Sequence, residues 1–435
     1  MSPPLKIALA GLGTVGTGTL TLLSVQADLL EQRCGRPLRV TAVSARDRKR
    51  DRGIDLSRFR WFDDAVEMAS KADADVVVEL IGGGDGPAKA LTEAAIRAGR
   101  HVVTANKAMI ALHGPELGAA AEEAGLTLAY EAAVAGAVPV IRAIREGLAA
   151  NRISRVHGIL NGTCNYILSV MRETGRGFDD VLAEAQRLGY AEADPSFDVD
   201  GIDTAHKLAI LASLAFGTRI DFADTFVDGI RRISADDIAF AGELGYRIKL
   251  LGTAQACDGG LQLRVHPAMV PMNAPIATVE GVLNAVECES DFAGTTMLEG
   301  RGAGARPTAS AVVGDLIDIA LGRTTPVYGV PVARLARLPI IPMEHHIGPY
   351  YVRLMVYDKP GVFADVAAIL RDHEISMEAV IQRSRSATEA VPVVLTTHET
   401  RESAMNGALA AIGKLPSVAE APHMIRIEQF EAARR

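Results

Sequence analysis

The stretch Gly11-Leu12-Gly13-Thr14-Val15-Gly16 decides the fold of the first part of this chain, because it follows an apolar run at residues 7–10 and opens a helix-like segment. In a strand–turn–helix unit with this spacing, the first glycine makes the tight turn, the second lets backbone approach a pyrophosphate, and the third lets helix and strand pack closely. The helix N-terminus adds unpaired N–H groups and a partial positive charge. We therefore predict a bound dinucleotide here, the alternative being a glycine-rich structural turn. The residues expected to contact it are Gly11, Gly13, Thr14, Val15 and Gly16.

Short apolar runs alternate with helix-like segments through the first 150 residues. The helix-like segments at residues 88–98 and 116–124 end at Gly99 and Gly125, and glycine commonly follows a helix because it adopts the left-handed conformation without strain. Near-continuous apolar strands separated by helices are typical of a parallel sheet covered on both faces. The sequence thus predicts an α/β, Rossmann-type domain over residues 1–150. Its strands are expected at residues 7–10, 40–43, 76–78, 101–104 and 126–129.

The order of elements changes after residue 150. Helix-like segments come first and strand-like runs follow, which is typical of an α+β domain with a mostly antiparallel sheet, here residues 151–323. The helices are expected at residues 165–174, 178–188 and 202–215, and the strands at 246–255, 261–266 and 282–289. A last helix at residues 307–321 is expected to pack back on the first domain, so that residues 305–323 complete it.

The remainder of the chain contains a linker and a third domain. Five prolines between residues 324 and 349 exclude a long helix or a central strand, so this segment is expected to lie over the surface. Residues 350–430 follow the order βαββαβ, which is ferredoxin-like. A small domain on such a linker could move or pair with a second copy.

Composition argues against several classes of protein. The 45 basic and 53 acidic residues give a net charge of −8, which argues against a nucleic-acid-binding surface. No apolar run approaches the ~18 residues that a membrane span requires, and no signal-peptide pattern opens the chain. The four cysteines lie far apart without a C-x-x-C pair, so they indicate neither a disulfide framework nor a zinc site. We expect a cytoplasmic protein that binds neither nucleic acid nor membrane.

The end of the second predicted strand indicates which dinucleotide binds. NAD sites usually place Asp or Glu there, to accept a hydrogen bond from the ribose 2′-hydroxyl. This chain has Ser44-Ala45-Arg46 instead, followed by more basic residues, and guanidinium groups bind a 2′-phosphate through paired hydrogen bonds. NADP(H) is therefore favoured, with Arg46 as its ligand, while NAD(H) and a simply solvated loop stay open.

Two more segments follow predicted strands, at the edge of the sheet where ligands bind in α/β folds. The bare backbone of Gly82-Gly83-Gly84 is expected either to approach the cofactor or to form a flexible loop. Thr104 ends the next strand and Lys107 follows it, and both are expected to contact the cofactor. Because solvation explains a lysine at the end of a buried strand less easily than one on a helix surface, we predict a functional role for Lys107.

The densest polar segment is residues 189–207, where five acids within twelve positions precede an otherwise apolar helix. Asp203 and Lys207 are four residues apart, acid first, the better orientation for a helical ion pair. On an exposed helix this pair would need no function, but the face of Lys207 continues as an apolar stripe. Burial favours the neutral amine and Asp203 favours the ammonium, so we expect Lys207 to exchange a proton with a substrate oxygen. His206 is expected on another face, without such a role.

Four motifs of this chain resemble those of homoserine dehydrogenases. They are the block from Ala185 to Lys207, with its Gly-aromatic, Asp-Pro and Asp-to-Lys spacing, and the segments at residues 103–107, 130–136 and 158–166. The resemblance covers roughly residues 5–325, and the Asp-to-Lys block is its most specific part. It implies reversible NAD(P)H-dependent reduction of L-aspartate 4-semialdehyde to L-homoserine, in threonine, methionine and isoleucine biosynthesis. It also implies that the middle domain serves substrate binding and dimerisation.

The resemblance implies roles for single residues. Lys207 would donate a proton to the forming alkoxide and stabilise its charge. Asp203 would anchor the substrate and hold Lys207 in position, and Lys107 would lie between cofactor and substrate. Glu192 would bind the amino-acid end of the substrate, and Asp198 would either assist it or only shape the loop.

Two further sites follow from the same resemblance. One is a site for a monovalent cation, Na⁺, although the residues concerned could almost as well form only a loop that leads into a helix. The expected cation ligands are Glu131, Val134, Gly136 and Val138. The other is Gly302, which is expected either to approach the nicotinamide or to act only as a hinge between domains.

Residues 358–363, Asp-Lys-Pro-Gly-Val-Phe, resemble the signature of ACT domains, which commonly pair and bind a small amino acid near this turn. The resemblance implies L-threonine as a feedback effector and a homo-oligomer, either dimer or tetramer. Pairing without a ligand stays open.

Two other functions stay open as well. One is another NADP-dependent dehydrogenase that acts on an amino-acid aldehyde, and the other is a non-catalytic sensor of an amino acid and a dinucleotide. The pair of Asp203 and Lys207 favours an enzyme, because a sensor needs no proton relay.

Overall fold

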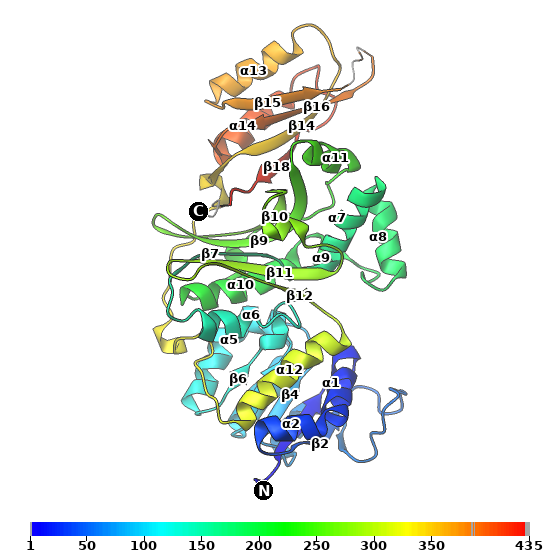
Figure 1. Ribbon diagram of the computed structural model, residues 1–435, viewed down its shortest axis with the longest axis vertical. Helices are drawn as coiled ribbons and strands as arrows, with labels where there is room; N and C mark the ends of the chain where they lie inside the picture. The colour runs from blue at the N-terminus through cyan, green and yellow to red at the C-terminus, as the bar shows by residue number, and fades with distance from the viewer. Residues whose placement is uncertain (1, 384–385, 387, 431–435) are drawn as a thin grey trace.

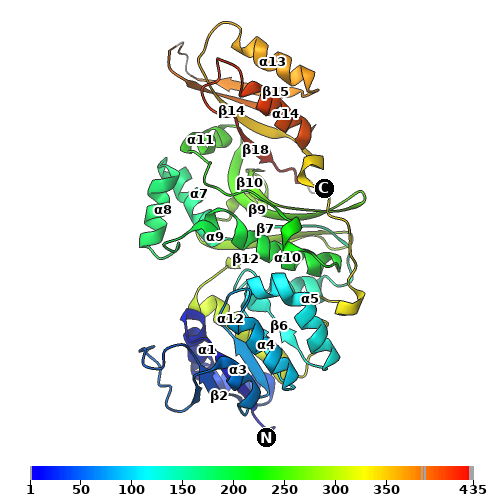
Figure 2. The ribbon, with the colours of Figure 1, turned by 180° about the vertical axis from the view of Figure 1, so that it is seen from behind.

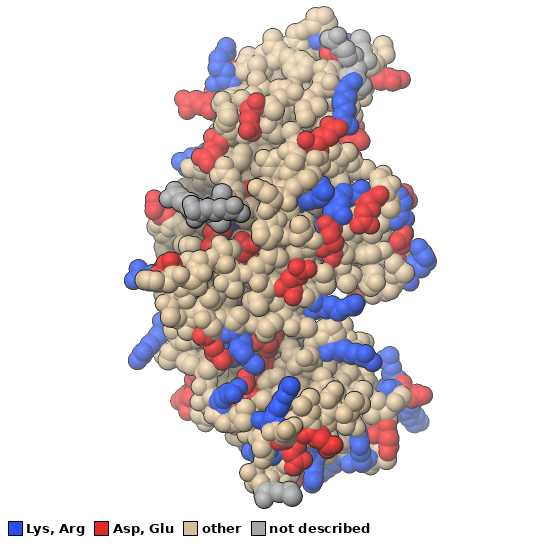
Figure 3. All heavy atoms as spheres, in the orientation of Figure 1, with Lys and Arg blue, Asp and Glu red and all other residues tan. Residues whose placement is uncertain are grey.

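A computed structural model of the chain describes residues 2–383, 386 and 388–430. The domains are stacked along one long axis, with the N-terminal domain at one end and the C-terminal unit at the other (Figure 1). Acidic and basic side chains are mixed over the face that Figure 3 presents. Within the described ranges, none of the helices combines the length and the hydropathy that a membrane span requires.

The N-terminal domain contains a parallel sheet with the strand order β3-β2-β1-β4-β5-β6. The order reverses between β1 and β4, and ligands bind at such a switch point. A Cβ on Gly16 would lie 1.9 Å from the carbonyl oxygen of Gly11, so only glycine lets the helix start this close to the turn. The prediction of a Rossmann-type domain is confirmed. The strands are β1 (Leu5–Ala10), β2 (Leu38–Ser44), β3 (Arg60–Phe62), β4 (Val76–Glu79), β5 (His101–Thr104) and β6 (Leu128–Ala129).

Helices cover both faces of this sheet. One group lies on the face seen in Figure 1 and the other on the face seen in Figure 2. The first group is α1 (Thr14–Val25), α2 (Ala27–Cys34) and α12 (Ala305–Ala320), and the second is α3 (Ala65–Lys71), α4 (Pro87–Arg97) and α5 (Lys107–Glu123). Helix α12 comes from far along the chain and packs on α1, where a Cβ on Gly18 would lie 2.7 Å from the carbonyl oxygen of Ala305. The last predicted helix therefore does pack on the first domain.

The middle domain places α10 on one face of a largely antiparallel sheet. A Cβ on Gly252 of β9 would lie 3.0 Å from Thr204 and 3.6 Å from Leu208, both on α10. The strands are β7 (Ile153–Ile159), β8 (Phe226–Val227), β9 (Tyr246–Cys257), β10 (Gly260–Pro271), β11 (Leu283–Ser290) and β12 (Gly294–Arg301). The helices are α6 (Val140–Arg142), α7 (Gly162–Thr174), α8 (Phe178–Arg187), α9 (Ser196–Val199), α10 (Ile202–Phe216) and α11 (Ala235–Glu243).

Three strands of this sheet were not predicted: the two-residue strand β8, and the longer strands β7 and β12. β7 carries the buried polar residues Arg155 and His157, and β12 is an edge strand with several exposed positions. Neither strand shows the apolar alternation by which a half-buried strand is identified from sequence. Short 3₁₀ helices and one π-helical turn complete the N-terminal and middle domains: η1 (Glu131–Ala133), η2 (Ala143–Gly147), η3 (Phe222–Asp224) and η4 (Pro275–Thr278).

The C-terminal unit has the strand order β18-β14-β16-β15, as a ferredoxin-like βαββαβ fold requires. Its last strand also pairs in parallel with β10 of the middle domain, with Ala268 opposite Arg426. One sheet of ten strands therefore runs through both domains, and the unit is not an independent module on a flexible tether. Its elements are β14 (Tyr350–Val356), α13 (Val362–Asp372), β15 (Met377–Gln382), β16 (Val391–Thr397), α14 (Glu402–Ile412) and β18 (His423–Ile427).

The proline-rich segment forms no long element, as predicted. Its residues are partly exposed and partly buried, and the carbonyl oxygen of Pro339 accepts a hydrogen bond from the backbone N–H of Leu261 at the start of β10. Its short elements are η5 (Val332–Arg334), η6 (Met343–His345) and β13 (Ile347–Gly348). β13 pairs with a two-residue strand of the C-terminal unit, β17 (Thr400–Arg401).

A buried ion cluster ties the end of β18 to the middle sheet. Glu428 accepts hydrogen bonds from Arg155 of β7 at 2.6 Å and from Arg264 of β10 at 3.1 Å. Burial alone would raise the pKa of Glu428, but the two guanidinium groups outweigh it and hold this pKa well below its usual range. The carboxylate therefore stays charged and links the C-terminal segment to two strands.

Glu428→Gln should lower the midpoint of thermal unfolding, because breaking a buried ion cluster on one side costs about 3–5 kcal/mol. The carboxylate stabilises the fold above its unfolded-state pKa of about 4.3, and this contribution is lost as the pH falls toward the folded-state value. The unfolding midpoints of the unaltered chain and of Glu428→Gln should therefore lie closer together in acid than near neutral pH. Circular dichroism melts near neutral pH and below about pH 4 measure this. Glu420→Gln, at an exposed position, serves as control, and equal midpoints near neutral pH would contradict the assignment.

Candidate active site

Asp203 and Lys207 lie one turn apart at the start of α10, and both are buried. The helix begins after Gly201, whose φ of 85° is a left-handed conformation that glycine adopts without strain. The Nζ of Lys207 lies 2.8 Å from Oδ2 of Asp203 and donates to the carbonyl oxygen of Leu160 at 2.6 Å. The amine is therefore held beside the end of β7 and does not extend into solvent.

Asp203 also binds a lysine from the N-terminal domain. The Nζ of Lys107 lies 2.7 Å from Oδ1 of Asp203. Lys107 is the first residue of α5, whose N-terminus is capped by Asn106 through a hydrogen bond from the backbone N–H of Met109. Helices α5 and α10 are in contact and lie next to each other in Figure 2. One carboxylate thus joins two ammonium groups across the contact between two domains.

Burial and charge act in opposite directions on these three groups. Burial favours the neutral acid of Asp203, but Lys207 and Lys107 outweigh it and hold the pKa of this carboxyl well below its usual range. Burial lowers the pKa of Lys207, and the charge of Lys107 adds to this shift while Asp203 opposes it. Burial also acts against the charge of Lys107, but there the Asp203 carboxylate prevails and the pKa is raised. Lys207 is therefore the lysine whose proton is more easily removed.

Asn161 connects Asp203 to Asp198. Its Nδ2 donates to Oδ2 of Asp203 and to Oδ1 of Asp198, both at 2.8 Å, and its Oδ1 accepts from the backbone N–H of Cys164. Burial, with the charge of Asp203, raises the pKa of Asp198. Asn161 lies inside the motif at residues 158–166 but was not predicted singly, because one asparagine before a helix is usually only a cap.

The rim of this cluster is formed by the loop between α8 and α10. Glu192 is exposed there, and its charge acts on Lys107. The ring of Phe197 lies 5.4 Å from the Nζ of Lys107, a cation–π contact. Phe197 stacks on His206, which in turn stacks on Phe222 with ring centroids 4.2 Å apart. His206 is thus packed between two aromatic rings.

The glycine turn opens onto a cavity of about 620 Å³ at the carboxyl ends of β1 and β2. A Cβ on Gly13 would meet no atom within 4 Å, so a phosphate has room to approach this backbone. Thr14 and Val15 begin α1 and bring their backbone N–H groups to the same turn. Of the predicted cofactor ligands, Gly11, Gly13 and Arg46 line the cavity.

Arg52 shapes this cavity and was not predicted. Its guanidinium donates to the carbonyl oxygens of Leu12 at 3.1 Å and Asp47 at 2.6 Å, which holds the basic loop against the glycine turn. The side chain also lies over the ring of Trp61. Within a run of basic residues, the sequence offers no signal that separates an arginine holding the loop from one that binds a ligand.

Thr104 is fully buried, and its hydroxyl donates to Glu79 at 2.5 Å. The same carboxylate accepts from two backbone N–H groups at the start of the glycine loop, those of Ile81 and Gly82. The Thr104 hydroxyl also accepts from the backbone N–H of Asn106. This network fixes the carboxyl ends of β4 and β5, and the side chain of Thr104 is part of it.

The expected cation ligands lie on one buried loop before α6; they are Glu131, Val134, Gly136 and Val138. Both carboxylate oxygens of Glu131 accept backbone N–H groups of α6 at 2.9 Å. The backbone is left-handed at Ala135 and Gly136. A Cβ on Gly136 would lie 2.4 Å from the carbonyl oxygen of Gly302, so this loop adjoins the residue expected near the nicotinamide. The donors that the resemblance implies, a carboxylate and backbone carbonyls, would form an all-oxygen set that suits a hard cation.

The turn at residues 358–363 connects β14 to α13 and borders a cavity of about 700 Å³. Gly361 has a φ of 100°, a conformation that favours glycine. The cavity is lined by Asp358, Lys359, Pro360, Gly361, Phe363, Ala364 and Ser386.

Family models match three segments of the chain. The model described as "Homoserine dehydrogenase" matches residues 139–317. The model described as "Homoserine dehydrogenase, NAD binding domain" matches residues 11–131, and the ACT domain model matches residues 350–417. These matches support a nicotinamide dinucleotide as cofactor.

Relatives resemble the chain over nearly its whole length. A homoserine dehydrogenase of Pseudomonas aeruginosa is 47% identical, covering 98% of this chain and 99% of the relative. The crystal structure of a homoserine dehydrogenase from Thiobacillus denitrificans is 46% identical, covers 98% of each chain and has a TM-score of 0.91. A hyperthermophilic archaeal homoserine dehydrogenase in complex with NADPH is 26% identical over 74% of this chain and 99% of its own, with a TM-score of 0.64.

These findings do not favour the two other functions left open by the sequence, a different amino-acid-aldehyde dehydrogenase and a non-catalytic sensor. The relative from Pseudomonas aeruginosa, a homoserine dehydrogenase, is 47% identical over 98% of this chain. Each of the three domains is matched by a family model. The chain belongs to the homoserine dehydrogenase family and is an oxidoreductase that acts on a CH–OH group, with a Rossmann-type NAD(P)-binding domain and a C-terminal ACT domain.

Proposed function

We propose that Lys207 is the proton donor in the reversible NAD(P)H-dependent reduction of L-aspartate 4-semialdehyde to L-homoserine. The observation that carries this proposal is the cluster of buried Lys207 and Asp203 with partly exposed Lys107, at the contact between two domains. A bound nicotinamide supplies the hydride in this direction and accepts it in the reverse. The protein's own residues hold the substrate, exclude water and move a proton at Nζ of Lys207.

The charges of the cluster suit a reaction that creates an oxyanion. Asp203 offsets one of the two ammonium charges and leaves the other to act on the substrate oxygen. In a buried site this charge stabilises a developing alkoxide more strongly than it would in water. Lys207, whose pKa is lowered by burial, gives up its proton, while Lys107, whose pKa is raised by the Asp203 carboxylate, remains charged.

Carboxylates around the lysines are the proposed substrate ligands. Asp203 anchors the substrate and positions Lys207, and Glu192 at the rim binds the ammonium of the amino-acid end. Asp198, joined to Asp203 through Asn161, assists Glu192 or shapes its loop.

The proposed cofactor is NADP(H), with NAD(H) as the second candidate. An acid is missing from the end of β2 and the guanidinium of Arg46 borders the cavity instead, which favours a 2′-phosphate. The complex of an archaeal relative with NADPH supports this preference. The proposed cofactor contacts are Gly11, Gly13, Thr14, Val15, Gly16, Arg46, Thr104, Lys107 and Gly302.

Several further properties are part of this proposal. Na⁺ is held by the Glu131 carboxylate and the carbonyls of Val134, Gly136 and Val138, and it stiffens the loop beside Gly302.

L-threonine binds at the ACT turn as effector, and the chain acts as a cytoplasmic homo-oligomer, dimer or tetramer. The domain limits are residues 1–150 with 305–323, 151–323, and 350–430, after a linker at 324–349.

Lys207→Ala should lower kcat for L-homoserine oxidation by at least about 10²-fold, the size of a general acid–base contribution. NADPH binding should be retained, because Lys207 does not line the dinucleotide cavity. Initial rates and fluorescence titration with NADPH measure the two effects. Lys249→Ala removes another buried lysine, which donates to Val279 outside the site, and serves as control. Near-normal turnover of the Lys207 variant would refute its role.

Asp203→Asn should shift the acidic limb of the pH–rate profile for homoserine oxidation to lower pH. In this direction Lys207 must be neutral to accept the proton, and Asp203 is the group that opposes the lowering of its pKa. Profiles of kcat/KM for both proteins give the position of the limb. The control is Asp200→Asn, because Asp200 pairs with Arg231 instead. A limb that stays in place or moves to higher pH would show that Asp203 does not set this pKa.

Arg46→Ala should weaken NADPH binding about tenfold or more, the value of a charge-assisted hydrogen bond. NADH lacks the 2′-phosphate, so its dissociation constant should change little. Direct titrations with the two cofactors provide the comparison, and Arg58→Ala, at an exposed position of the same domain, is the control. Equal losses for NADPH and NADH would remove the support for a 2′-phosphate contact.

A further inference from the structure

A row of buried polar side chains crosses the middle sheet. His157 of β7 is the partner of Thr253 on β9 and of Glu287 on β11, and directly paired residues point to the same face of a sheet. Gly252, the neighbour of Thr253, is the residue that contacts α10. Because successive residues of a strand alternate between faces, the row lies on the face opposite α10 and Lys207.

Atoms of this row lack hydrogen bonds. Within the part of the chain that the structure describes, no hydrogen bond reaches either ring nitrogen of His157, Oε2 of Glu287 or the hydroxyl of Thr253. His157 and Thr253 are 0% exposed and Glu287 is 4% exposed. A buried polar atom without a hydrogen bond is energetically unfavourable, so a ligand that engages several of these atoms would be favoured.

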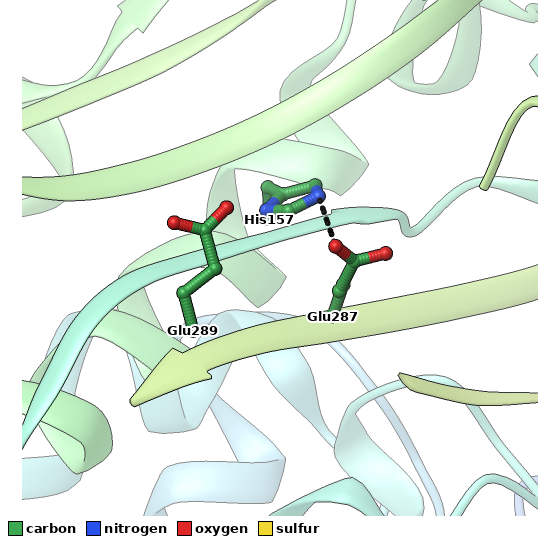
Figure 4. A group of neighbouring side chains, drawn as sticks. All are labelled: His157, Glu287 and Glu289. Atoms are coloured by element: carbon green, nitrogen blue, oxygen red, sulfur yellow. Dashed lines mark ion pairs between the residues drawn. The ribbon is translucent and has the colours of Figure 1, made fainter. Parts of the chain in front are cut away.

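Two carboxylates reach the imidazole of His157 from β11, as Figure 4 shows. Oε1 of Glu287 lies 3.6 Å from Nε2 of His157. Glu289 lies two residues further along the strand, and one ligand atom from each of the three side chains falls within 4.8 Å of the others. Arg155 is 3.5 Å from Glu289 and makes a shorter contact of 2.6 Å with Glu428.

We propose that His157, Glu287 and Glu289 bind one divalent transition-metal ion, with Zn²⁺ as the best fit. Imidazole nitrogen and carboxylate oxygen are both zinc ligands, whereas Ca²⁺ and Mg²⁺ take oxygen. Zinc bonds of about 2.0–2.2 Å require the ligand atoms to close in on one another, which rotation of the two glutamate side chains allows. The buried hydroxyl of Thr253, or a water, completes a tetrahedral set.

The ion has a route to this site and a structural role in it. The side chain of Glu289 is 20% exposed and borders a cavity of about 1090 Å³, from which an ion can enter. On the other side, the ring of Phe430 packs against His157 with centroids 5.1 Å apart. Zinc would therefore join β7 to β11 beneath the C-terminal segment, away from the Asp203 cluster, and stabilise the fold without entering the reaction.

The test is zinc binding by the full-length chain after removal of metal with a chelator. Isothermal titration with ZnCl₂ should give one site per chain, and zinc should raise the midpoint of thermal unfolding, since a ligand that binds only the folded state stabilises it. Co²⁺ in its place should give the visible absorption of a tetrahedral ion. Glu287→Gln and Glu289→Gln keep the side-chain volume but weaken the ligand, so each should lower zinc affinity at least tenfold.

Glu299→Gln, at an exposed position of the neighbouring strand β12, is the matched control and should bind zinc like the unaltered chain. Glu289 lies partly exposed, so its variant stays informative if loss of Glu287 impairs folding, which circular dichroism reports. Absence of a stoichiometric zinc site would overturn the proposal. Zinc binding that neither glutamate variant weakens would overturn it as well, because the ion would then lie elsewhere.

Discussion

The position of one carboxylate between two ammonium groups is the constraint on which the site depends. Lys207 is buried and Lys107 is partly exposed, and the two ammonium groups would repel each other without Asp203 between them. The contact of Lys107 with Asp203 requires a fixed position of the N-terminal domain relative to the middle domain. Each partner is held by its own element: Lys107 by the capped start of α5, and Lys207 by the carbonyl oxygen of Leu160.

This arrangement also separates the roles of two chemically identical side chains. The pKa of Lys107 is raised and its ammonium contacts the ring of Phe197, whereas Lys207 is more deeply buried and its pKa is lowered. Burial disfavours an ammonium, so the deeper lysine is the one suited to lose a proton and the outer one is suited to remain a fixed charge. The same chemistry explains why an aspartate, not a neutral residue, stands at position 203.

Local patterns in the sequence predicted the parts of the fold and site that depend on neighbours along the chain. The glycine turn, the alternating strands and helices of the first domain, and the spacing of Asp203 and Lys207 are of this kind. The contact of Lys107 with Asp203 and the pairing of β18 with β10 join residues that are far apart in sequence. The spacing of apolar residues along a single segment does not predict such contacts. Arg52 and Asn161 were missed because their residue types are common in loops and caps that have no function.

The ten-stranded sheet gives the ACT domain a direct geometric relation to the catalytic amine. From β18 the hydrogen-bonded ladder passes through β10 and β9 to β7, and the residue after β7 is Leu160, whose carbonyl oxygen accepts a hydrogen bond from Lys207. Both ends of this path belong to one ten-stranded sheet. A displacement of the ACT domain must either distort backbone hydrogen bonds within the sheet or change the place at which the ammonium is anchored.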